Sequence, residues 1–201
     1  MAKLTLDDIS DLRAYERERD DFRRQIIDLK KKRRVPVGDI LTLLFENSRT
    51  IRFQIQEMAR IEKIISDEGI ETELRVYNPL IPEPGQLCAT LFIELTSDEA
   101  LRDWLPKLVG IEKAVGLRLG DGGPGSEVVP AVVDEEHERQ LTREEITASV
   151  HYVRWELTPD QIERFAAGPV AVVCSHPAYE AETVLTGATV AELVADLRGG
   201  G

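Results

Sequence analysis

The sequence predicts an α+β fold with a mostly antiparallel sheet, a central helix packed on that sheet and an N-terminal pair of helices. Three observations predict it. The chain has 201 residues, of which 42% are hydrophobic, enough to bury one substantial core. Apolar or alternating stretches of strand length recur at 41–46, 87–95, 146–157 and 170–174. Helical patterns lie between them, but no strand–helix unit repeats at the spacing of a doubly wound parallel sheet.

The N-terminal residues are predicted to form a helical arm. Thr5 to Asp8 resembles a capping box with Asp in place of Glu, and it begins a short helix. A second helix is expected from about Glu18 to Arg33, because its acidic start and basic end both suit the helix dipole. Pro36 cannot continue the hydrogen bonds of that helix. We therefore expect an arm over residues 1–34, an α+β domain over 35–198 and a disordered tail over 199–201.

The central stretch combines a strand over 41–46 with a helix that begins near Thr50 and continues to about Ile65. One arc of this helix is predicted to face the core, and it contains Ile51, Ile55, Met58, Ile61 and Ile65. Gln54 and Glu62 fall within the same arc. Because a buried amide or carboxylate needs a partner, either these two hold a polar network or the buried arc is slightly rotated. The opposite face is predicted to carry Arg49, Arg52, Gln56, Arg60 and Lys63, with Glu57 beside Arg60.

The elements after the central helix follow from local signals. Gly69 is expected to end the central helix, 74–77 to be extended, and the prolines of 78–85 to stiffen a loop. Later strands are predicted at 87–95, 115–119, 128–133, 146–157 and 170–174, with Pro130 indicating an edge position. Further helices are predicted after Ser97, with a kink or an end at Pro106, from Thr158 to Gly168, and over 189–197.

Two histidines lie at informative places. Alternation along the strand 146–157 puts His151 on the more apolar face and Arg154 on the other face. A buried histidine usually satisfies its nitrogens with neighbours, but a pairing with Glu62 or Gln54 is the alternative. His176 ends a strand beside a proline, where either a site or a structural turn can form.

These side chains define a candidate polar site whose members are Glu46, Gln54, Glu57, Arg60, Glu62, His151, Arg154 and His176. Carboxylates and histidines suit acid–base work or the binding of iron or zinc. The helical Glu-x-x-His repeats of diiron proteins do not occur, nor do the HExxH, GxSxG or GKS/T motifs. The sequence therefore leaves the catalytic residues, the metal and any cofactor unassigned.

Charge is unevenly distributed. The formal net charge is −12, which argues against a general nucleic-acid or anionic-membrane binder. Residues 1–34 carry 11 Lys and Arg against 8 Asp and Glu, so the arm is +3 and the remainder is −15. The arm could dock on its own body or on an acidic partner. Its basic run comprises Lys30, Lys31, Lys32, Arg33 and Arg34, and it is either a solvated helix end that compensates the dipole or a partner-docking patch. No secretory or membrane-spanning run occurs, so we expect a cytoplasmic protein.

Three further features have simple structural interpretations. Cys88 and Cys174 lie far apart without a CxxC pair, which predicts two reduced core thiols. The glycines of 120–125 have the GxGxxG spacing, but a strand with a proline follows them, so a hairpin loop is expected in place of a nucleotide site. The acidic run 134–138 with His137 is either solvated surface or a weak site for a divalent ion.

Several blocks resemble one bacterial family. They are Leu43 to Asn47, Arg52 to Met58, Arg60 to Glu62, Tyr77 to Pro82, Ala89 to Leu91, Gly110 to Glu112, Val150 to Tyr152 with Arg154, and His176 to Tyr179. The chain is thereby identified as a member of the family catalogued as domain of unknown function 3501. The resemblance implies no activity. It implies a setting, because genes of this family tend to lie beside those for rubrerythrin-like diiron proteins and iron–sulfur oxidoreductases.

Two functional hypotheses follow. The first is a non-catalytic accessory partner of such an iron or iron–sulfur redox system, favoured by the basic arm and the family's setting. The alternative is a metal-dependent or acid–base enzyme that uses Glu46, Glu57, Glu62, His151 and His176. The two differ in one checkable feature, because the enzyme hypothesis requires the histidines and carboxylates to converge.

Overall fold

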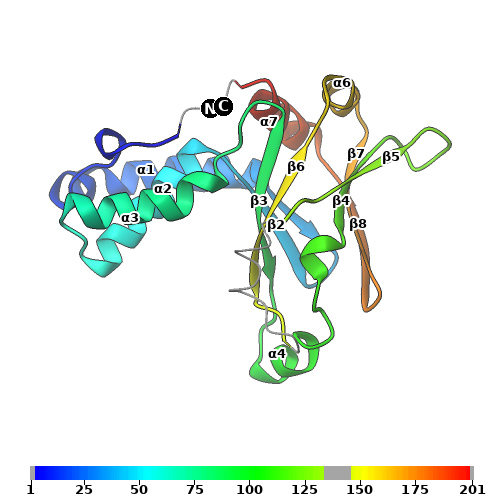
Figure 1. The fold of residues 1–201 in the computed structure, drawn as a ribbon, viewed down its shortest axis with the longest axis horizontal. Coiled ribbons are helices and arrows are strands. Elements are labelled where there is room, and N and C mark those ends of the chain that lie inside the picture. Colours follow the sequence, from blue (N-terminus) through cyan, green and yellow to red (C-terminus); the bar gives the residue numbers. More distant parts are fainter. Residues whose placement is uncertain (1–2, 134–145, 200–201) are drawn as a thin grey trace.

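A computed structural model describes residues 3–133 and 146–199. Within them the chain forms six α-helices and two four-stranded antiparallel sheets, which confirms the predicted α+β class (Figure 1). The predicted acidic run 134–138 lies outside the described residues, as do the last two residues of the predicted tail.

The strands divide into two sheets rather than the one that was expected. Sheet A has the order β1 (Arg34–Val37), β2 (Leu41–Glu46), β3 (Gln86–Ile93) and β6 (Val150–Glu156). Sheet B has the order β5 (Glu127–Pro130), β4 (Val115–Leu119), β7 (Val170–His176) and β8 (Tyr179–Val184). All neighbouring strands in both sheets are antiparallel. The glycine-rich residues 120–125 connect β4 to β5 as the predicted hairpin loop.

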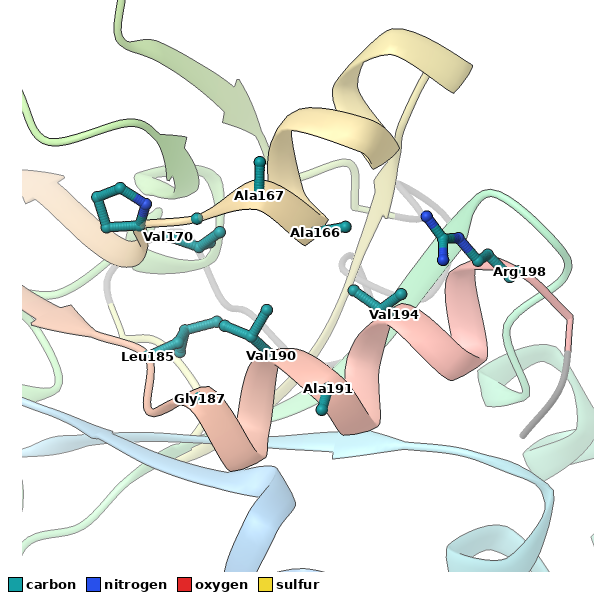
Figure 2. A pocket seen from close by; sticks show the side chains of 11 residues that line it. Ala166, Ala167, Val170, Leu185, Gly187, Val190, Ala191, Val194 and Arg198 are labelled. Carbon is teal, nitrogen blue, oxygen red and sulfur yellow. The ribbon is translucent and has the colours of Figure 1, made fainter.

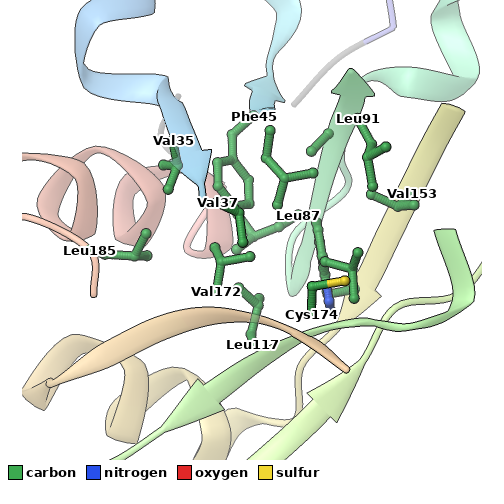
Figure 3. Packing of buried hydrophobic residues seen from close by; sticks show 14 of the residues in the cluster. Val35, Val37, Phe45, Leu87, Leu91, Leu117, Val153, Val172, Cys174 and Leu185 are labelled. Atoms are coloured by element: carbon green, nitrogen blue, oxygen red, sulfur yellow. The ribbon is translucent and has the colours of Figure 1, made fainter. Parts of the chain in front are cut away.

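The two sheets face each other across one hydrophobic core (Figure 3). Alternate residues of each strand point into it, so Phe45 and Leu91 of sheet A meet Leu117 and Val172 of sheet B, all with an exposed fraction of zero. Burial of each such side chain stabilises the fold by about 1.5–3 kcal/mol. The intervening residues of sheet A form a second face, which we call the outer face because it points away from sheet B.

The two sheets contact each other at both edges of the core. At one edge Val132, beyond β5, exchanges backbone hydrogen bonds with Arg154 of β6 at 2.6 and 2.9 Å. At the other edge the Thr183 hydroxyl of β8 donates to the carbonyl of Pro36 in β1 at 2.7 Å. The edge β1 tolerates Pro36 because a proline lacks only the N–H group that an edge strand can leave unpaired. The two sheets are therefore connected at both edges of the core.

Three helices form the arm. They are α1 (Leu12–Arg33), α2 (Ser48–Glu62) and α3 (Asp67–Tyr77). They lie side by side and project from the outer side of sheet A (Figure 1). The 3₁₀ turn η1 (Leu6–Asp8) precedes them, and η2 (Asn78–Leu80) follows them. A small apolar cluster of its own, which includes Ile51, Ile55 and Leu74, holds the arm together.

The body carries the other helices. They are α4 (Asp98–Trp104), the turn η3 (Ile111–Lys113), α6 (Pro159–Ala167) and α7 (Gly187–Leu197). Helices α6 and α7 lie at one end of the sheets, next to each other (Figure 1). Helix α4 ends before Pro106, as the sequence predicted. In the part of the chain that is described, no helix is both long and apolar enough to cross a membrane.

Two boundaries in the arm differ from the prediction. Helix α1 begins at Leu12, six residues before the predicted start. The Asp11 carboxylate caps it there, because it accepts hydrogen bonds from the N–H groups of Arg13 and Ala14. The stretch expected to be extended at 74–77 is instead the end of α3. Gly69 does not end a helix, because the Ser66 hydroxyl caps α3 and accepts from the Gly69 N–H at 3.3 Å.

Candidate functional site

The buried arc of α2 is rotated from the simplest expectation. Its buried side chains are Thr50, Ile51, Ile55, Gln56 and Ala59. Gln54 is only half-buried and Glu62 is exposed, so these two do not form a buried network. Helix α2 ends at Glu62 because Lys63 adopts the left-handed conformation, with φ of 57°. Two predicted core residues therefore lie at the surface, where Ile61 is 67% exposed and Ile65 is 87% exposed.

The buried amide of α2 is that of Gln56, which had been placed on the basic outer face. Its Oε1 accepts from the N–H of Ser10 at 2.8 Å, and its Nε2 donates to the carbonyl of Ser10 at 3.1 Å. Both halves of the amide are thus satisfied, which is the condition for burying it at low cost. Gln56 holds the segment before α1 against α2.

Glu57 binds α1 to α2. Its carboxylate accepts from Nε and Nη2 of Arg19 at 2.7 and 2.9 Å, and from the Tyr15 hydroxyl at 2.7 Å. The hydrogen bonds from Arg19 hold the pKa of Glu57 below its usual value. Arg60 makes a second link between the same helices, with its Nε 2.5 Å from Oε1 of Glu16. Both predicted site residues are therefore occupied in contacts between α1 and α2.

Glu46 lies buried at the end of β2, on the outer face. Its carboxylate accepts from the hydroxyls of Thr50 and Thr90, the latter at 2.7 Å. It also directly precedes the capping residue of α2, where the helix dipole favours a negative charge. These contacts explain how the Glu46 carboxylate can be kept inside the fold.

The strand register groups polar residues around Glu46. Glu46 pairs with Cys88 of β3, and Cys88 pairs with Arg154 of β6, so the three form one row across the outer face. Thr90 and Tyr152 pair in an adjacent row. Burial raises the pKa of the Cys88 thiol to about 12, so the thiol is protonated near neutral pH. Of the predicted site residues, Glu46 and Arg154 therefore lie in the same row of the outer face, on β2 and β6, with β3 between them.

His151 and His176 occupy different sheets. In sheet A, Nε2 of His151 lies 2.9 Å from the hydroxyl of Thr147 and 2.8 Å from the carbonyl of Ala148. In sheet B, the Ala178 N–H donates to Nδ1 of His176 at 3.2 Å, while Nε2 lies 3.1 Å from the carbonyl of Val109. Backbone groups therefore satisfy both nitrogens of His176, and Nε2 carries its proton.

The sequence carries no signal for the buried carboxylate that lies beside His151. Glu112 in η3 is 1% exposed, and its Oε2 lies 3.9 Å from Nδ1 of His151. Neither Glu62 nor Gln54 contributes to this pair. The local pattern gave no chemical signal for Glu112, because it stands in a short turn and its neighbour in space lies 39 positions along the chain. Within residues 3–133 and 146–199, no three Cys, His, Asp or Glu side chains gather into a metal-binding group.

The basic run at the end of α1 joins the arm to the body. Arg33 has an exposed fraction of zero, and it donates to the carbonyls of Phe45 and Glu46 at 2.8 and 3.1 Å. It also pairs with Glu192 at 3.1 Å and with the buried carboxylate of Asp196, both in α7. Burial raises the pKa of Asp196, although Arg33 opposes that rise. Arg33 is thus inside the molecule and not available to a docking partner.

The other members of the run have weaker contacts at the surface. Lys31 pairs with Asp28 at 2.7 Å, Lys32 lies 3.9 Å from Glu192, and Arg34 pairs with Glu94. The Nζ of Lys30 lies 5.5 Å from the centre of the Phe53 ring. Such exposed pairs contribute little stability, so these four side chains can exchange partners at small cost.

The described surface includes two grooves. One, of about 520 Å³, lies between α6 and α7 and is lined mainly by small apolar side chains, with Arg198 at one end (Figure 2). The other, of about 350 Å³, lies between the segment before α1 and the connection from α2 to α3. Its lining comprises Leu6, Ile9, Ser10, Asp11, Leu12, Arg13, Ala59, Ile64, Ile65, Asp67 and Ile70. We call this second groove, together with the exposed Ile61, the arm tip.

The comparisons with known proteins agree with the fold and the sequence blocks. None of the curated proteins matches this chain. A crystal structure of a protein of unknown function from Burkholderia pseudomallei is 39% identical, with a TM-score of 0.88. That match covers 98% of this chain and 100% of the other. The model of the family described as protein of unknown function (DUF3501) matches residues 3–197, so the chain belongs to the DUF3501 family.

Proposed function

We propose that this chain is a cytoplasmic, non-catalytic accessory partner of an iron or iron–sulfur redox protein, either a rubrerythrin-like protein or an iron–sulfur oxidoreductase. The observation that carries the proposal is the arm tip. It combines an apolar groove with Ile61 and Ile65, two isoleucines that are mostly exposed. Grouped apolar side chains at a surface mark sites of protein interaction, because water contact with them is unfavourable.

The contacts of the candidate polar residues support a binding role. Glu57 is bound by Arg19 and Tyr15, and His176 lies between two backbone groups. Glu46 accepts from two threonine hydroxyls. Each of these groups stabilises the fold through its contacts. These contacts account for the polar groups without a substrate.

The redox character of the partner is supported by the family resemblance. Genes of the DUF3501 family tend to lie beside those for rubrerythrin-like and iron–sulfur proteins, which makes these two protein classes the first candidates for binding. This support comes from gene neighbourhood. The physical support is the exposed apolar surface of the arm tip.

The test is direct binding between full-length purified proteins. Each candidate redox protein is titrated into this chain by calorimetry, and the mixture is examined by size-exclusion chromatography with light scattering. We expect a stable complex with at least one of the two. The absence of binding by both, under conditions where each redox protein retains its iron, would refute the proposal.

A second candidate function is an acid–base or metal-dependent enzyme. The specific observation in its favour is the buried pair of Glu112 and His151, 3.9 Å apart. Buried carboxylate–histidine pairs occur at catalytic sites as well as in structural networks. Elemental analysis of protein purified without chelator tests the metal-dependent form of this candidate. Near-stoichiometric iron, zinc or manganese that is lost in His151→Gln would favour the enzyme.

A further inference from the structure

We propose that the arm tip binds a basic amphipathic α-helix of the partner, with aliphatic side chains of that helix in the groove. This inference deepens the proposed function and rests on it. It requires three properties of the tip, namely an apolar floor, a rim of the right charge and a shape that suits a helix.

The floor of the groove is aliphatic. Leu6, Ile9 and Leu12 line one side, while Ile64, Ile65 and Ile70 line the other. Ile65 is 87% exposed and lies outside both α2 and α3, so the fold covers little of its side chain. A volume of about 350 Å³ lies at the lower end of the range for ligand pockets, roughly 300–1,000 Å³, and suits a few aliphatic side chains.

The rim is acidic, although residues 1–34 as a whole carry a net charge of +3. Residues 5–13 and 60–71 together carry three Lys or Arg and seven Asp or Glu, a net charge of −4. The charged residues that line the groove are Asp11, Arg13 and Asp67. Two further exposed carboxylates, Asp7 and Glu68, directly follow the lining residues Leu6 and Asp67 in the sequence. A partner whose own rim carries Lys and Arg is complementary to this charge, and an acidic one is repelled.

The surrounding structure favours a helix as the occupant. The tip is built from helices and turns, so it offers no strand edge to which an extended peptide could add. A helix instead places aliphatic residues at positions i, i+4 and i+7 in one line, with Lys or Arg on both flanks. A second copy of this chain is disfavoured, because a symmetric contact would put one acidic rim against the other.

The test uses the full-length chain and two synthetic 18-residue peptides, each with leucines along one helical face. One peptide carries lysines on the other face and its counterpart carries glutamates. Fluorescence anisotropy of the labelled peptides measures binding at low and moderate salt. We expect the lysine peptide to bind, with weaker binding as salt rises, and the glutamate peptide not to bind.

Variants separate the groove from general charge attraction. The double substitution Ile61→Ser with Ile65→Ser is expected to weaken binding of the lysine peptide at least tenfold. Ile27→Ser is the matched control, because Ile27 is an exposed isoleucine of the same arm, at 42%, outside the groove. It should leave binding unchanged. Asp67→Asn with Glu68→Gln should reduce both the affinity and its salt dependence. Circular dichroism verifies that every variant is folded.

Specific outcomes would overturn the inference. Equal binding of the lysine peptide to wild type and to the Ile61→Ser, Ile65→Ser variant would show that the groove is not the site. A dimer in sedimentation that this variant abolishes would identify a second copy as the occupant. If a redox partner binds wild type and this variant equally, the inference fails while the proposed function stands. If the lysine peptide binds through the groove but neither redox protein binds, the redox assignment fails and the groove's specificity stands.

Discussion

Arg33 shows how one side chain connects the arm to the body. Its guanidinium reaches the carbonyls at the end of β2 and the carboxylates of Glu192 and Asp196 in α7. The planar fork of arginine can serve several acceptors at once, which a lysine cannot do. The buried charge of Asp196 is tolerated because Arg33 is beside it.

The first prediction concerns this pair. Arg33→Met leaves Asp196 buried without its cation, so we expect the free energy of unfolding to fall by about 3–5 kcal/mol, measured by urea denaturation. Adding Asp196→Leu should restore part of that loss, because it removes the uncompensated charge. Lys31→Ala, which breaks only an exposed pair, should change stability by less than about 0.5 kcal/mol. A loss as small as that control in Arg33→Met would contradict the buried pair.

The second prediction concerns Glu57 and pH. Because Arg19 lowers the pKa of Glu57 in the folded state, the carboxylate stabilises the fold at neutral pH. That contribution is lost as pH falls from the ordinary glutamate pKa, about 4.3, toward the lower folded value. Glu57→Gln should therefore be less stable than wild type near pH 7, by less than Arg33→Met, with the difference vanishing in acid. Urea denaturation across pH measures it, and a difference that grows in acid would contradict the assignment.

At the scale of elements, the sequence predicted the helices and strands that have a local apolar or capping pattern. The strand 87–95 and the capped helix 158–168 were found because apolar alternation and capping residues are local signals. Strand β8 was missed because its inward positions are Tyr179, Ala181 and Thr183, which give a weak apolar pattern. The buried arc of α2 was misplaced because Gln56 is satisfied by Ser10, which lies 46 positions away. For the same reason the sequence could not reveal that Arg33 pairs with Asp196.

The third prediction tests how two elements close one edge of the core. The Tyr179 hydroxyl in β8 donates to the carbonyl of Val37 and accepts from the N–H of Asp39, both at 2.8 Å. Tyr179→Phe removes these bonds, so we expect a loss of about 1–2 kcal/mol in thermal or urea denaturation. Ser175→Ala, at an exposed position of β7, is the control and should stay within about 0.5 kcal/mol. A stability equal to that of the control would mean that the hydroxyl does not tie the two sheets together.

At the scale of the whole molecule, the question is whether the arm and the body open together. Cys174 lies in the core between the sheets, whereas Cys88 lies on the outer face, the side from which the arm projects. Both thiols are buried, and burial raises the pKa of each. Neither should react with iodoacetamide in the native state at pH 8, because the thiolate is the reactive form.

The fourth prediction uses these thiols as reporters. Because Arg33 binds the arm to both β2 and α7, we expect the arm to detach from the body only when the body itself unfolds. Both cysteines of wild type should then be alkylated with the same urea dependence, read by mass spectrometry. In Arg33→Met the link from the arm to β2 and α7 is lost. Since α7 contacts β3, which carries Cys88, Cys88 should react before Cys174. Faster alkylation of Cys88 in wild type would instead show that the arm opens independently. In that case the groove at the arm tip would belong to a mobile element, and its partner would have to bear the cost of ordering it.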